Sequence, residues 1–390
     1  MSVLFCHDGP LRKDLNNQYY GIAHTDEMFS RYKVVSDYIK VLIRAKKITS
    51  SEEKKLSKIT LDNLSIVETP SIASTKGLLL NRKVLKDIIH NQVKDSSFVI
   101  ARLPSHNGNF AVDSAIKLNK PYLIELVACP WDSLWNHSLK GKLIAPIMSY
   151  QTKSKVKRAS HVVYVTESFL QHRYPTLGKS INCSNVTLTE FDDRTLQNRL
   201  NKIKRINNNE KVVIGTAAAV DVKYKGQQYI IEALGKLKKE GIQHFYYEIV
   251  GDGDQQYLKS IAQKNDVTEN VSFLGAIPHA MINNWLDNLD IYVQPSRQEG
   301  LPRSLIEAMS RGLPSFGART GGIPELLDEN FIFSNSSNNI DEICTILNSF
   351  DNNSMKKQAE FNYDRSKNYD KKTIDEKRKR FFIQSLNDLL

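Results

Sequence analysis

One stretch, residues 294–325, constrains the fold more than any other part of the sequence. It follows a short apolar run, Ile291–Val293, and opens with Gln294-Pro295-Ser296. An apolar run of this size, closed by Pro-Ser, predicts a buried strand that ends in a loop. In an open α/β sheet, ligands bind where the carboxyl end of a strand meets the N-terminus of a helix. The loop after Val293 is therefore the first place to expect a site.

The segment after this loop predicts a helix. Pro302 suits the first helical turn, Ser304 and Glu307 have the spacing of a capping box, and Gly312 is a stop signal. Apolar residues between them (Leu305, Ile306 and Met309) give the helix a face to bury.

Two kinds of group for a ligand meet at the start of this helix. The free backbone N–H groups of Gly300 and Leu301 would favour an anion. Glu299 on the loop and Glu307 about two turns into the helix, at a rise of ~1.5 Å per residue, would suit ribose and sugar hydroxyls. The alternative for Glu307 alone is a helix cap, and the alternative for Glu299 is a solvated loop charge.

The alternation of apolar runs and helical patterns predicts an α/β protein with two Rossmann-like, doubly wound parallel-sheet domains. We expect a first domain over residues 1–188, a polar connector over 189–210, a second domain over 211–365 and a last helix over 366–390. Within the first domain, the apolar spacing predicts a helix from Asp26 to Lys46 and a last strand from Asn182 to Leu188. The length of 390 residues is enough for two domains of ordinary size.

Composition excludes several classes of protein. No run approaches the ~18 apolar residues of a membrane span, and the start turns polar after five residues, so we expect a cytoplasmic protein without a signal peptide. The four cysteines lie far apart, which indicates neither a disulfide framework nor a zinc site. The net charge of +11 is dispersed and comes with no nucleic-acid-binding motif, so a membrane surface or a phosphorylated acceptor fits it better than a nucleic acid.

The pattern Glu-x7-Glu within Pro-Ser-x-x-Glu-Gly-Leu-Pro and Glu-Ala-Met-x-x-Gly-x-Pro resembles the retaining GT-B glycosyltransferases of family 4, or glycosyltransferase group 1, of the type that assembles bacterial surface polysaccharides. The resemblance implies two domains facing a cleft, with the last helix crossing back to the first domain. It implies a hexosyltransferase that moves a sugar from a UDP- or GDP-sugar to a hydroxyl of a glycan or lipid-linked glycan and retains the anomeric configuration. The setting would be O-antigen, lipopolysaccharide, capsule or exopolysaccharide biosynthesis, and neither a metal nor another cofactor is expected.

The resemblance also assigns donor-binding roles. Glu307 would hold the ribose and Glu299 the donor sugar, while Leu274 and Ala276 would contact the base. The other residues carried over or placed near the donor are Gly300, Leu301, Pro302, Arg303, Gly215, Lys223, Gly251, Gly321 and Gly322. Glycines let the backbone approach a ligand or simply tighten a turn, and for Gly251 both readings stay open.

A cationic clamp for the donor pyrophosphate is incomplete in this sequence. Lys225, followed by Gly226, matches the family's Lys-Gly pair, but Val220 stands where the family has an arginine. The clamp is therefore either weakened or completed by another cation, for which Lys223, Arg297 and Arg303 are the candidates. Stabilisation of the leaving diphosphate by Lys225 and the helix N-terminus would be electrostatic catalysis.

The first half of the chain carries candidates for the acceptor side. Asp132 and His137 lie beside Trp131 and Trp135, just after a predicted strand, and aromatic faces are common partners of sugar rings. The alternative is that the tryptophans are core residues and that His137 caps a helix. The loops after the first strand add His7, Gly9 and Gly21, for which ordinary turns are the competing interpretation.

A basic segment, residues 138–158, contains six lysines and arginines and no acid, with apolar residues between them. Such a segment can lie on the anionic inner face of the cytoplasmic membrane, or it can be a solvated helix face over an apolar core.

Three other activities stay open. A non-hydrolysing nucleotide-sugar 2-epimerase would share the GT-B fold, and a non-catalytic nucleotide-sugar-binding protein would bind the donor without turnover. A retaining glycosidase would also use two carboxylates, but it needs neither a phosphate clamp nor a doubly wound sheet.

Overall fold

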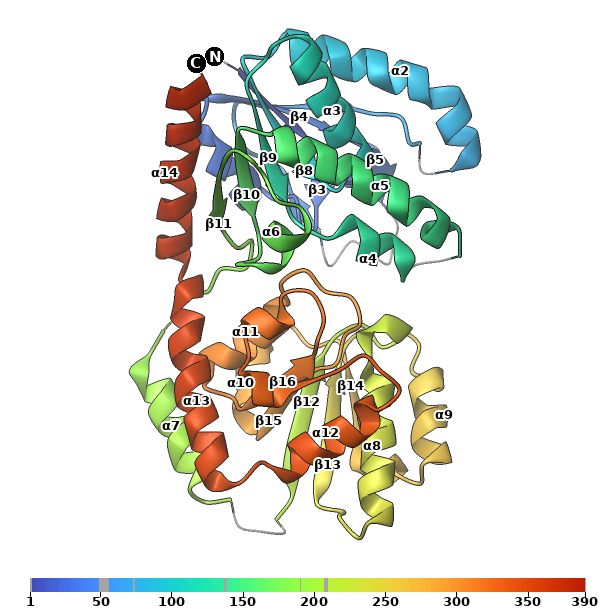
Figure 1. The fold of residues 1–390 in the computed structure, drawn as a ribbon, viewed down its shortest axis with the longest axis vertical. Coiled ribbons are helices and arrows are strands. Elements are labelled where there is room, and N and C mark those ends of the chain that lie inside the picture. The colour runs from blue at the N-terminus through green and yellow to red at the C-terminus, as the bar shows by residue number, and fades with distance from the viewer. Residues whose placement is uncertain are drawn as a thin grey trace. The chain divides into compact units, whose positions relative to one another are not determined.

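The computed structural model describes residues 2–48, 56–72, 74–136, 139–189, 191–206 and 210–389. The chain divides into two compact units, shown in Figure 1. Unit 1 contains Met1–Cys183 and Asp375–Leu390, and unit 2 contains Ser184–Ile374.

Unit 1 is built on a parallel sheet of seven described strands in the order β11-β10-β9-β8-β1-β4-β7. Its strands are β1 (Ser2–Cys6), β4 (Tyr38–Ile43), β7 (Leu64–Glu68), β8 (Phe98–Leu103), β9 (Tyr122–Leu126), β10 (His161–Tyr164) and β11 (Lys179–Asn182). A smaller mixed sheet contains β2 (Leu11–Lys13), β3 (Tyr19–Gly21), β5 (Ala45–Lys47) and β6 (Ser57–Lys58). The helices are α1 (Asp26–Ser30), η1 (Arg31–Val34), α2 (Thr75–Lys94), α3 (His106–Lys117), α4 (Pro130–Trp135), α5 (Leu139–Arg158), α6 (Phe169–Arg173) and the larger part of α14 (Lys371–Leu389).

Alternate residues of β1 show how helices cover both faces of this sheet. Leu4 and Cys6 belong to a buried cluster that includes residues of α2 and α3. Phe5 points the other way, and its ring centroid lies 5.3 Å from that of Tyr32 in η1. Tyr32 in turn stacks on Phe382 of α14 at 5.9 Å. Because successive side chains of a strand face opposite sides, the sheet is buried on both faces, as doubly wound folds require.

Unit 2 repeats this architecture with a parallel sheet of six described strands in the order β14-β13-β12-β15-β16-β17. The strands are β12 (Val212–Ala217), β13 (Phe245–Val250), β14 (Val271–Gly275), β15 (Ile291–Gln294), β16 (Ser315–Ala318) and β17 (Ile332–Phe333). The α-helices are α7 (Asp193–Ile203), α8 (Gln227–Lys239), α9 (Gln256–Lys264), α10 (His279–Asn288), α11 (Arg303–Ser310), α12 (Asn339–Asn348) and α13 (Asn352–Ser366). Short 3₁₀ turns are η3 (Lys223–Lys225), η4 (Thr268–Asn270), η5 (Ile323–Glu325), η6 (Glu329–Phe331) and η7 (Lys367–Tyr369).

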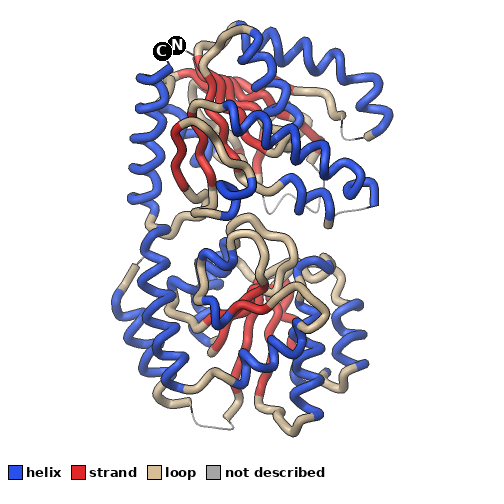
Figure 2. The backbone as a smooth tube through the Cα atoms, in the orientation of Figure 1, coloured by secondary structure: helices blue, strands red, loops and turns tan. Residues whose placement is uncertain are grey.

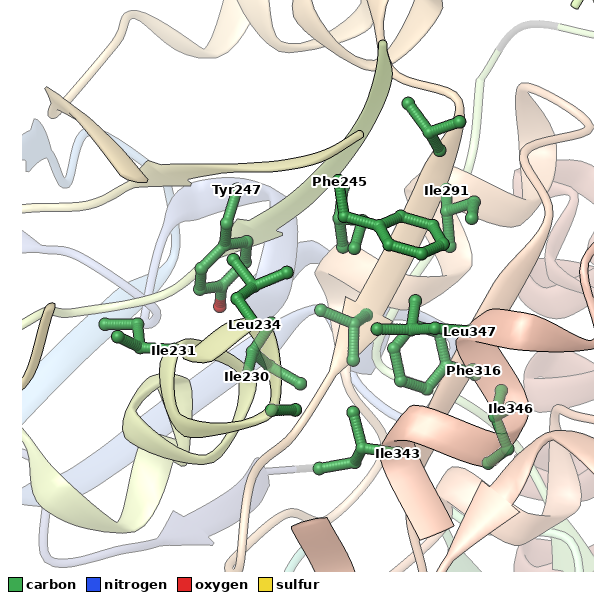
Figure 3. Packing of buried hydrophobic residues seen from close by; sticks show 14 of the residues in the cluster. Ile230, Ile231, Leu234, Phe245, Tyr247, Ile291, Phe316, Ile343, Ile346 and Leu347 are labelled. Carbon is green, nitrogen blue, oxygen red and sulfur yellow. The ribbon is translucent and has the colours of Figure 1, made fainter. Parts of the chain in front are cut away.

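The core of unit 2 forms where α8 and α12 pack on the sheet. Figure 3 shows Ile230, Ile231 and Leu234 of α8 close to Phe245 and Tyr247 of β13, with the apolar face of α12 (Ile343, Ile346 and Leu347) nearby. The one polar atom of the labelled side chains, the Tyr247 hydroxyl, donates a hydrogen bond of 2.8 Å to Thr216. This rigid layer supports the carboxyl ends of β12 and β15, from which the candidate site is built.

The predicted fold class is confirmed, since both units are α/β with parallel sheets. The helix predicted from Asp26 to Lys46 is wrong: α1 ends at Ser30, the 3₁₀ turn η1 ends at Val34, and Tyr38–Ile43 forms strand β4. The apolar residues of this segment fit both periods, and pairing with β1 and β7 on either side favours the strand.

Two further boundaries differ from the prediction. The proposed connector, residues 189–210, contains helix α7, whose Leu196, Leu200 and Ile203 pack on the core of unit 2. The last strand of unit 1 is Lys179–Asn182 and not Asn182–Leu188. Helix α7 is amphipathic, so its apolar residues stand among polar ones, and the largely polar strand β11 is defined by its pairing with β10.

No helix in the part of the chain that the structure describes is long and apolar enough to cross a membrane.

Candidate functional site

The candidate site begins where the turn before α8 meets the loop after β15. Gly226 has a φ of +80°, and a Cβ there would lie 1.9 Å from the carbonyl oxygen of Pro295, so only glycine allows this approach. The Arg297 N–H donates to the Tyr224 carbonyl at 2.7 Å. The two segments singled out in the sequence, around Lys225 and around Glu299, are therefore held against each other.

Lys225 and Glu299 form an ion pair at the centre of this contact. The Nζ of Lys225 lies 2.7 Å from Oε1 of Glu299. Both side chains are largely buried, with 23% and 13% of their surface exposed. An ammonium group has three donors, so Lys225 can bind Glu299 and still offer N–H groups to an anion.

Gln294, at the end of β15, connects the carboxylate to the sheet. Its Nε2 donates to Glu299 at 3.2 Å and to the Ser296 hydroxyl at 2.9 Å. Its Oε1 accepts from the hydroxyls of Tyr292 at 3.2 Å and Ser304 at 3.1 Å. Gln294 was not among the site residues predicted from the sequence, although an amide directly after an apolar strand run is a usable signal.

Helix α11 starts one residue later than predicted and without the capping box. Pro302 is the N-cap, no side chain of the described chain caps the helix, and the Ser304 hydroxyl bonds to Gln294 instead. Gln294 is buried, so its Oε1 needs hydrogen-bond donors. The Ser304 hydroxyl supplies one of them instead of capping the helix. The first N–H groups of α11, next to Gly300 and Leu301, thus keep their capacity to bind an anion.

Glu307 lies on the first turns of α11 with 13% of its side chain exposed. His279 Nε2 lies 3.3 Å from its Oε1, and the Arg303 guanidinium lies 3.8 Å from the same oxygen. A carboxylate with one half-exposed cation beside it can still accept hydrogen bonds from vicinal hydroxyls.

The loop after β16 lies against the loop that carries Glu299. The Gly322 N–H donates to the Gly300 carbonyl at 2.7 Å. Gly321 has a φ of +56°, and a Cβ there would lie 2.1 Å from the Glu299 carbonyl oxygen. The structure therefore brings Gly321 and Gly322 against the Glu299 loop.

The two other glycines predicted to lie near the donor, Gly251 and Gly215, serve packing in different ways. Gly251 follows β13, and a Cβ there would lie 1.8 Å from the Ala218 carbonyl oxygen. Its N–H donates to the Gly275 carbonyl at 2.9 Å, so it ties β13 to the turn that carries the exposed Leu274 and Ala276. Gly215 lies inside β12, where a Cβ would lie 2.1 Å from Leu289 Cδ1, which indicates a packing reason for this glycine.

Three cations were candidates for the missing clamp arginine, and the structure separates them. Lys223 Nζ lies 4.6 Å from the Tyr257 ring centroid, and the Arg297 guanidinium lies 4.3 Å from that of Tyr229. Arg303, at the start of α11, has 52% of its side chain exposed and lies beside Glu307. Val220 itself is 2% exposed within the core. Of the three, Arg303 is the one for which the structure describes a contact with Glu307, the predicted ribose ligand.

In unit 1, Asp132 lies in α4 and forms an ion pair with Arg173 at 3.0 Å. Trp131 and Trp135 stack on each other, with ring centroids 5.0 Å apart and an angle of 13° between the planes. Trp131 packs on the buried cluster of unit 1, whereas 39% of Trp135 is exposed. His137 lies outside the described residues.

The loops after β1 and β3 bring two histidines together. His7 and His24 have ring centroids 5.0 Å apart, and the His7 Nδ1 accepts from the Gly9 N–H at 3.1 Å. Burial, then the neighbouring His24 and Arg102, holds the pKa of His7 well below its ordinary value. Burial and the same arginine lower the pKa of His24 to about 4. Both imidazoles are therefore neutral near pH 7.

Gly21 makes this arrangement possible, since a Cβ there would lie 1.8 Å from the His24 carbonyl oxygen. His24 was missed in the sequence, because nothing in its local pattern indicates a long-range contact with His7. Among the described residues, no group of three or more His, Cys, Asp or Glu side chains could hold a metal ion.

The chain shares its fold with several solved structures. The HepE structure from Anabaena, solved with UDP, superimposes with a TM-score of 0.64 over 100% of both chains at 17% identity. WaaG, a glycosyltransferase involved in lipopolysaccharide biosynthesis, gives a TM-score of 0.61 over 98% of this chain and 99% of that one at 13% identity. These likenesses establish the predicted GT-B fold.

Sequence similarity defines the family. The model for glycosyl transferases group 1 matches residues 197–367. Protein CapJ of Staphylococcus aureus is 33% identical over 336 residues, which cover 85% of this chain and 82% of that protein. The amylovoran biosynthesis glycosyltransferase AmsK of Erwinia amylovora is 38% identical over 113 residues, 27% of this chain and 28% of its own. The chain belongs to the group 1 glycosyltransferases, and it is a glycosyltransferase.

Proposed function

We propose that this glycosyltransferase moves a sugar from a UDP- or GDP-sugar to a hydroxyl of a glycan or lipid-linked glycan, with retention of the anomeric configuration. The observation that carries the proposal is the Lys225–Glu299 ion pair on the loop that leads into the uncapped start of α11, the helix that carries Glu307. Support comes from HepE, which has been solved with UDP, with UDP and glucose, and with UDP-glucose. The setting proposed is bacterial surface-polysaccharide assembly, which the names of AmsK and of the colanic acid glycosyltransferase WcaL suggest.

In this proposal the pyrophosphate binds the first N–H groups of α11 and the ammonium of Lys225. As the bond between the anomeric carbon and the β-phosphate oxygen breaks, negative charge grows on the leaving diphosphate. Fixed donors that point at this charge stabilise the transition state more than the ground state, and no reorganisation is needed at the moment of reaction. Glu299, held by Gln294 and Lys225, accepts from hydroxyls of the donor sugar.

Arg303 takes the place of the absent clamp arginine in the proposal. Its guanidinium, half exposed at the start of α11, can bind a phosphate oxygen in a bidentate manner. Glu307 then binds the ribose hydroxyls, and the exposed Leu274 and Ala276 flank the base. On the acceptor side we propose Asp132 and His137 as polar contacts, with His7, Gly9, Gly21, Trp131 and Trp135 around the acceptor. The proposed location is the cytoplasm, where the enzyme acts without a metal ion or other cofactor.

The experiment that tests this proposal measures nucleotide release over a panel of UDP- and GDP-sugars, with and without lipid-diphosphate-linked glycan acceptors. We expect release with one donor that depends on an acceptor, and a product whose anomeric configuration, determined by NMR, matches the donor. Conversion of the donor sugar without an acceptor would indicate a 2-epimerase. Binding without release under any condition would indicate a non-catalytic binding protein.

A further inference from the structure

Gln294 is the last residue of β15, and its side chain contacts the loop that carries Glu299. Only 1% of Gln294 is exposed, so the polar atoms of its amide need partners inside the protein. Figure 2 shows loops, drawn in tan, that extend beyond the strands of unit 2, and residues 295–302 between β15 and α11 form one of them. The amide of Gln294 is therefore a buried contact between the end of a strand and this loop.

The hydrogen bonds around Gln294 fix the direction in which its amide points. The Tyr292 hydroxyl accepts from the Ala217 N–H at 3.3 Å and lies 3.2 Å from Oε1 of Gln294. Burial raises the pKa of Tyr292, and the charges of Glu307 and Glu299 add to this, so the phenol keeps its proton and can donate it. The amide oxygen of Gln294 therefore faces Tyr292, which leaves the Nε2 donors for Glu299.

The Nε2 group of Gln294 and the ammonium of Lys225 donate to the same oxygen of Glu299. Nε2 lies 3.2 Å from Oε1 of Glu299, and Nζ of Lys225 lies 2.7 Å from it. Within the described part of the chain, no group donates a hydrogen bond to the other oxygen, Oε2. An ionised carboxylate only accepts hydrogen bonds, so Oε2 keeps its capacity for a hydroxyl group of a ligand.

We propose that Gln294 is a positioning residue for the transfer reaction, which holds Oε1 of Glu299 beside Lys225 and so reserves Oε2 for a hydroxyl of the donor sugar. This role rests on the proposed function, in which Glu299 contacts the donor sugar. It also places a chemical requirement on the donor. A carboxylate oxygen favours a sugar that presents a hydroxyl at this point and disfavours one that presents a carboxylate there.

The alternative is that Gln294 only fills space in the core of unit 2. Gln358 provides a matched comparison, because it is also a buried glutamine of this unit, with 4% of its surface exposed. Its Oε1 accepts from the Ser315 N–H at 2.9 Å, so it links α13 to β16 and not to the Glu299 loop. Loss of the Gln358 amide should therefore affect stability alone.

Binding measured by calorimetry separates positioning from space filling. The probes are the UDP- or GDP-sugar that gives the most nucleotide release in the donor panel and the nucleoside diphosphate that lacks the sugar. Gln294→Met keeps the size of the side chain but removes the amide. It should weaken donor binding about tenfold and change binding of the nucleoside diphosphate less than about threefold. Gln358→Met should change neither, and melting temperatures show how much each variant is destabilised.

Gln294→Glu gives a readout that a space-filling residue would not change. Its carboxyl group can accept from Tyr292 and, when protonated, can donate to Glu299 as the amide does. Two carboxylates at this distance do not both ionise readily, even with Lys225 facing them, so one pKa of the pair is raised. The donor affinity of this variant should be close to that of the wild type at pH 6 and about tenfold weaker at pH 8.5. The wild type and Gln358→Met should change less than about threefold between these pH values.

Equal losses of donor and nucleoside diphosphate binding in Gln294→Met would overturn the inference. The same holds if donor binding by Gln294→Glu does not weaken between pH 6 and pH 8.5. A wild-type chain that releases no nucleotide and binds no UDP- or GDP-sugar would contradict the proposed function, and the inference with it. Donor binding by the wild type that both Gln294 variants preserve would contradict the inference alone.

Discussion

Helix α3 in unit 1 and helix α11 in unit 2 both follow a parallel strand, but the N–H groups at their N-termini are used differently. The start of α3 is filled by the chain itself: the Asp8 carboxylate accepts from the N–H groups of His106 and Asn107 at 2.8 and 2.9 Å, and Ser105 accepts from Gly108. No described side chain caps α11. An anion site at a helix N-terminus requires free N–H groups, which α11 offers and α3 does not. The start of α11 is therefore where we propose that the donor pyrophosphate binds.

The largest effect is expected for substitution of Lys225, the cation that we place beside the start of α11. Lys225→Ala should lower kcat about 10²–10³-fold, because it removes a fixed donor to the leaving diphosphate. Steady-state nucleotide release with saturating donor measures this. Lys223→Ala is the matched control, since its ammonium lies against the Tyr257 ring, and it should cost little. Equal losses in the two variants would contradict the special role of Lys225.

The next effect concerns the ribose contact. Glu307→Gln should lower kcat/KM about 10–100-fold, mainly through KM, because a charged acceptor of hydrogen bonds becomes a neutral one. Calorimetric titration with UDP and GDP should show the same loss in affinity. Glu329→Gln, an exposed carboxylate that pairs with Arg319, is the control. Unchanged nucleotide affinity in Glu307→Gln would refute the ribose role.

Arg303 tests whether the clamp is completed at the start of α11. Arg303→Ala should weaken UDP binding about twentyfold, the value of a charge-assisted hydrogen bond to phosphate. Arg297→Ala should not, because its guanidinium lies over the Tyr229 ring. If wild-type protein binds UDP and Arg297→Ala is the weaker variant, the assignment of the two arginines must be exchanged.

On the unit 1 side, Asp132→Asn should lower the transfer rate about tenfold through a lost contact with the acceptor hydroxyl and leave UDP affinity unchanged. Arg173→Ala separates this role from a structural one, since it breaks the same ion pair but keeps the carboxylate. A loss in Arg173→Ala that equals the loss in Asp132→Asn would show that Asp132 only holds α4 in place.

The difference between the two units also explains what could be predicted from the sequence. The Glu299 loop and α11 are contiguous in the chain, so turn residues, apolar spacing and the motif gave their positions almost to the residue. Other contacts join residues that are far apart in the sequence or that no local pattern connects: Lys225 pairs with Glu299, and the rings of His7 and His24 lie against each other. Strand β4 could not be predicted for a similar reason. Its apolar spacing fits both a helix and a strand, and pairing with β1 and β7 favours the strand.

The smallest expected effect is on the pH dependence of stability, and it arises from the His7–His24 pair of unit 1. His24 has a folded-state pKa of about 4, against about 6.5 in an unfolded chain. Below pH 6.5 the unfolded state binds a proton that the folded state does not, so stability is full above pH 6.5 and falls as the pH drops toward 4. For His24 alone the loss between pH 7.5 and 5.5 is about 1.4 kcal/mol.

Urea unfolding at these two pH values, followed by circular dichroism, measures that slope. His24→Gln should flatten it by about this amount, since glutamine does not titrate. His172→Gln, at an exposed position of α6, should leave it unchanged. Burial is the largest cause of the low pKa of His24. The pH dependence of stability therefore also depends on the close approach of Gly21 to the His24 carbonyl. If His24→Gln kept the full wild-type slope, the pH dependence would have to arise from His7 or from carboxylates elsewhere, and the dry environment inferred for the pair would be wrong.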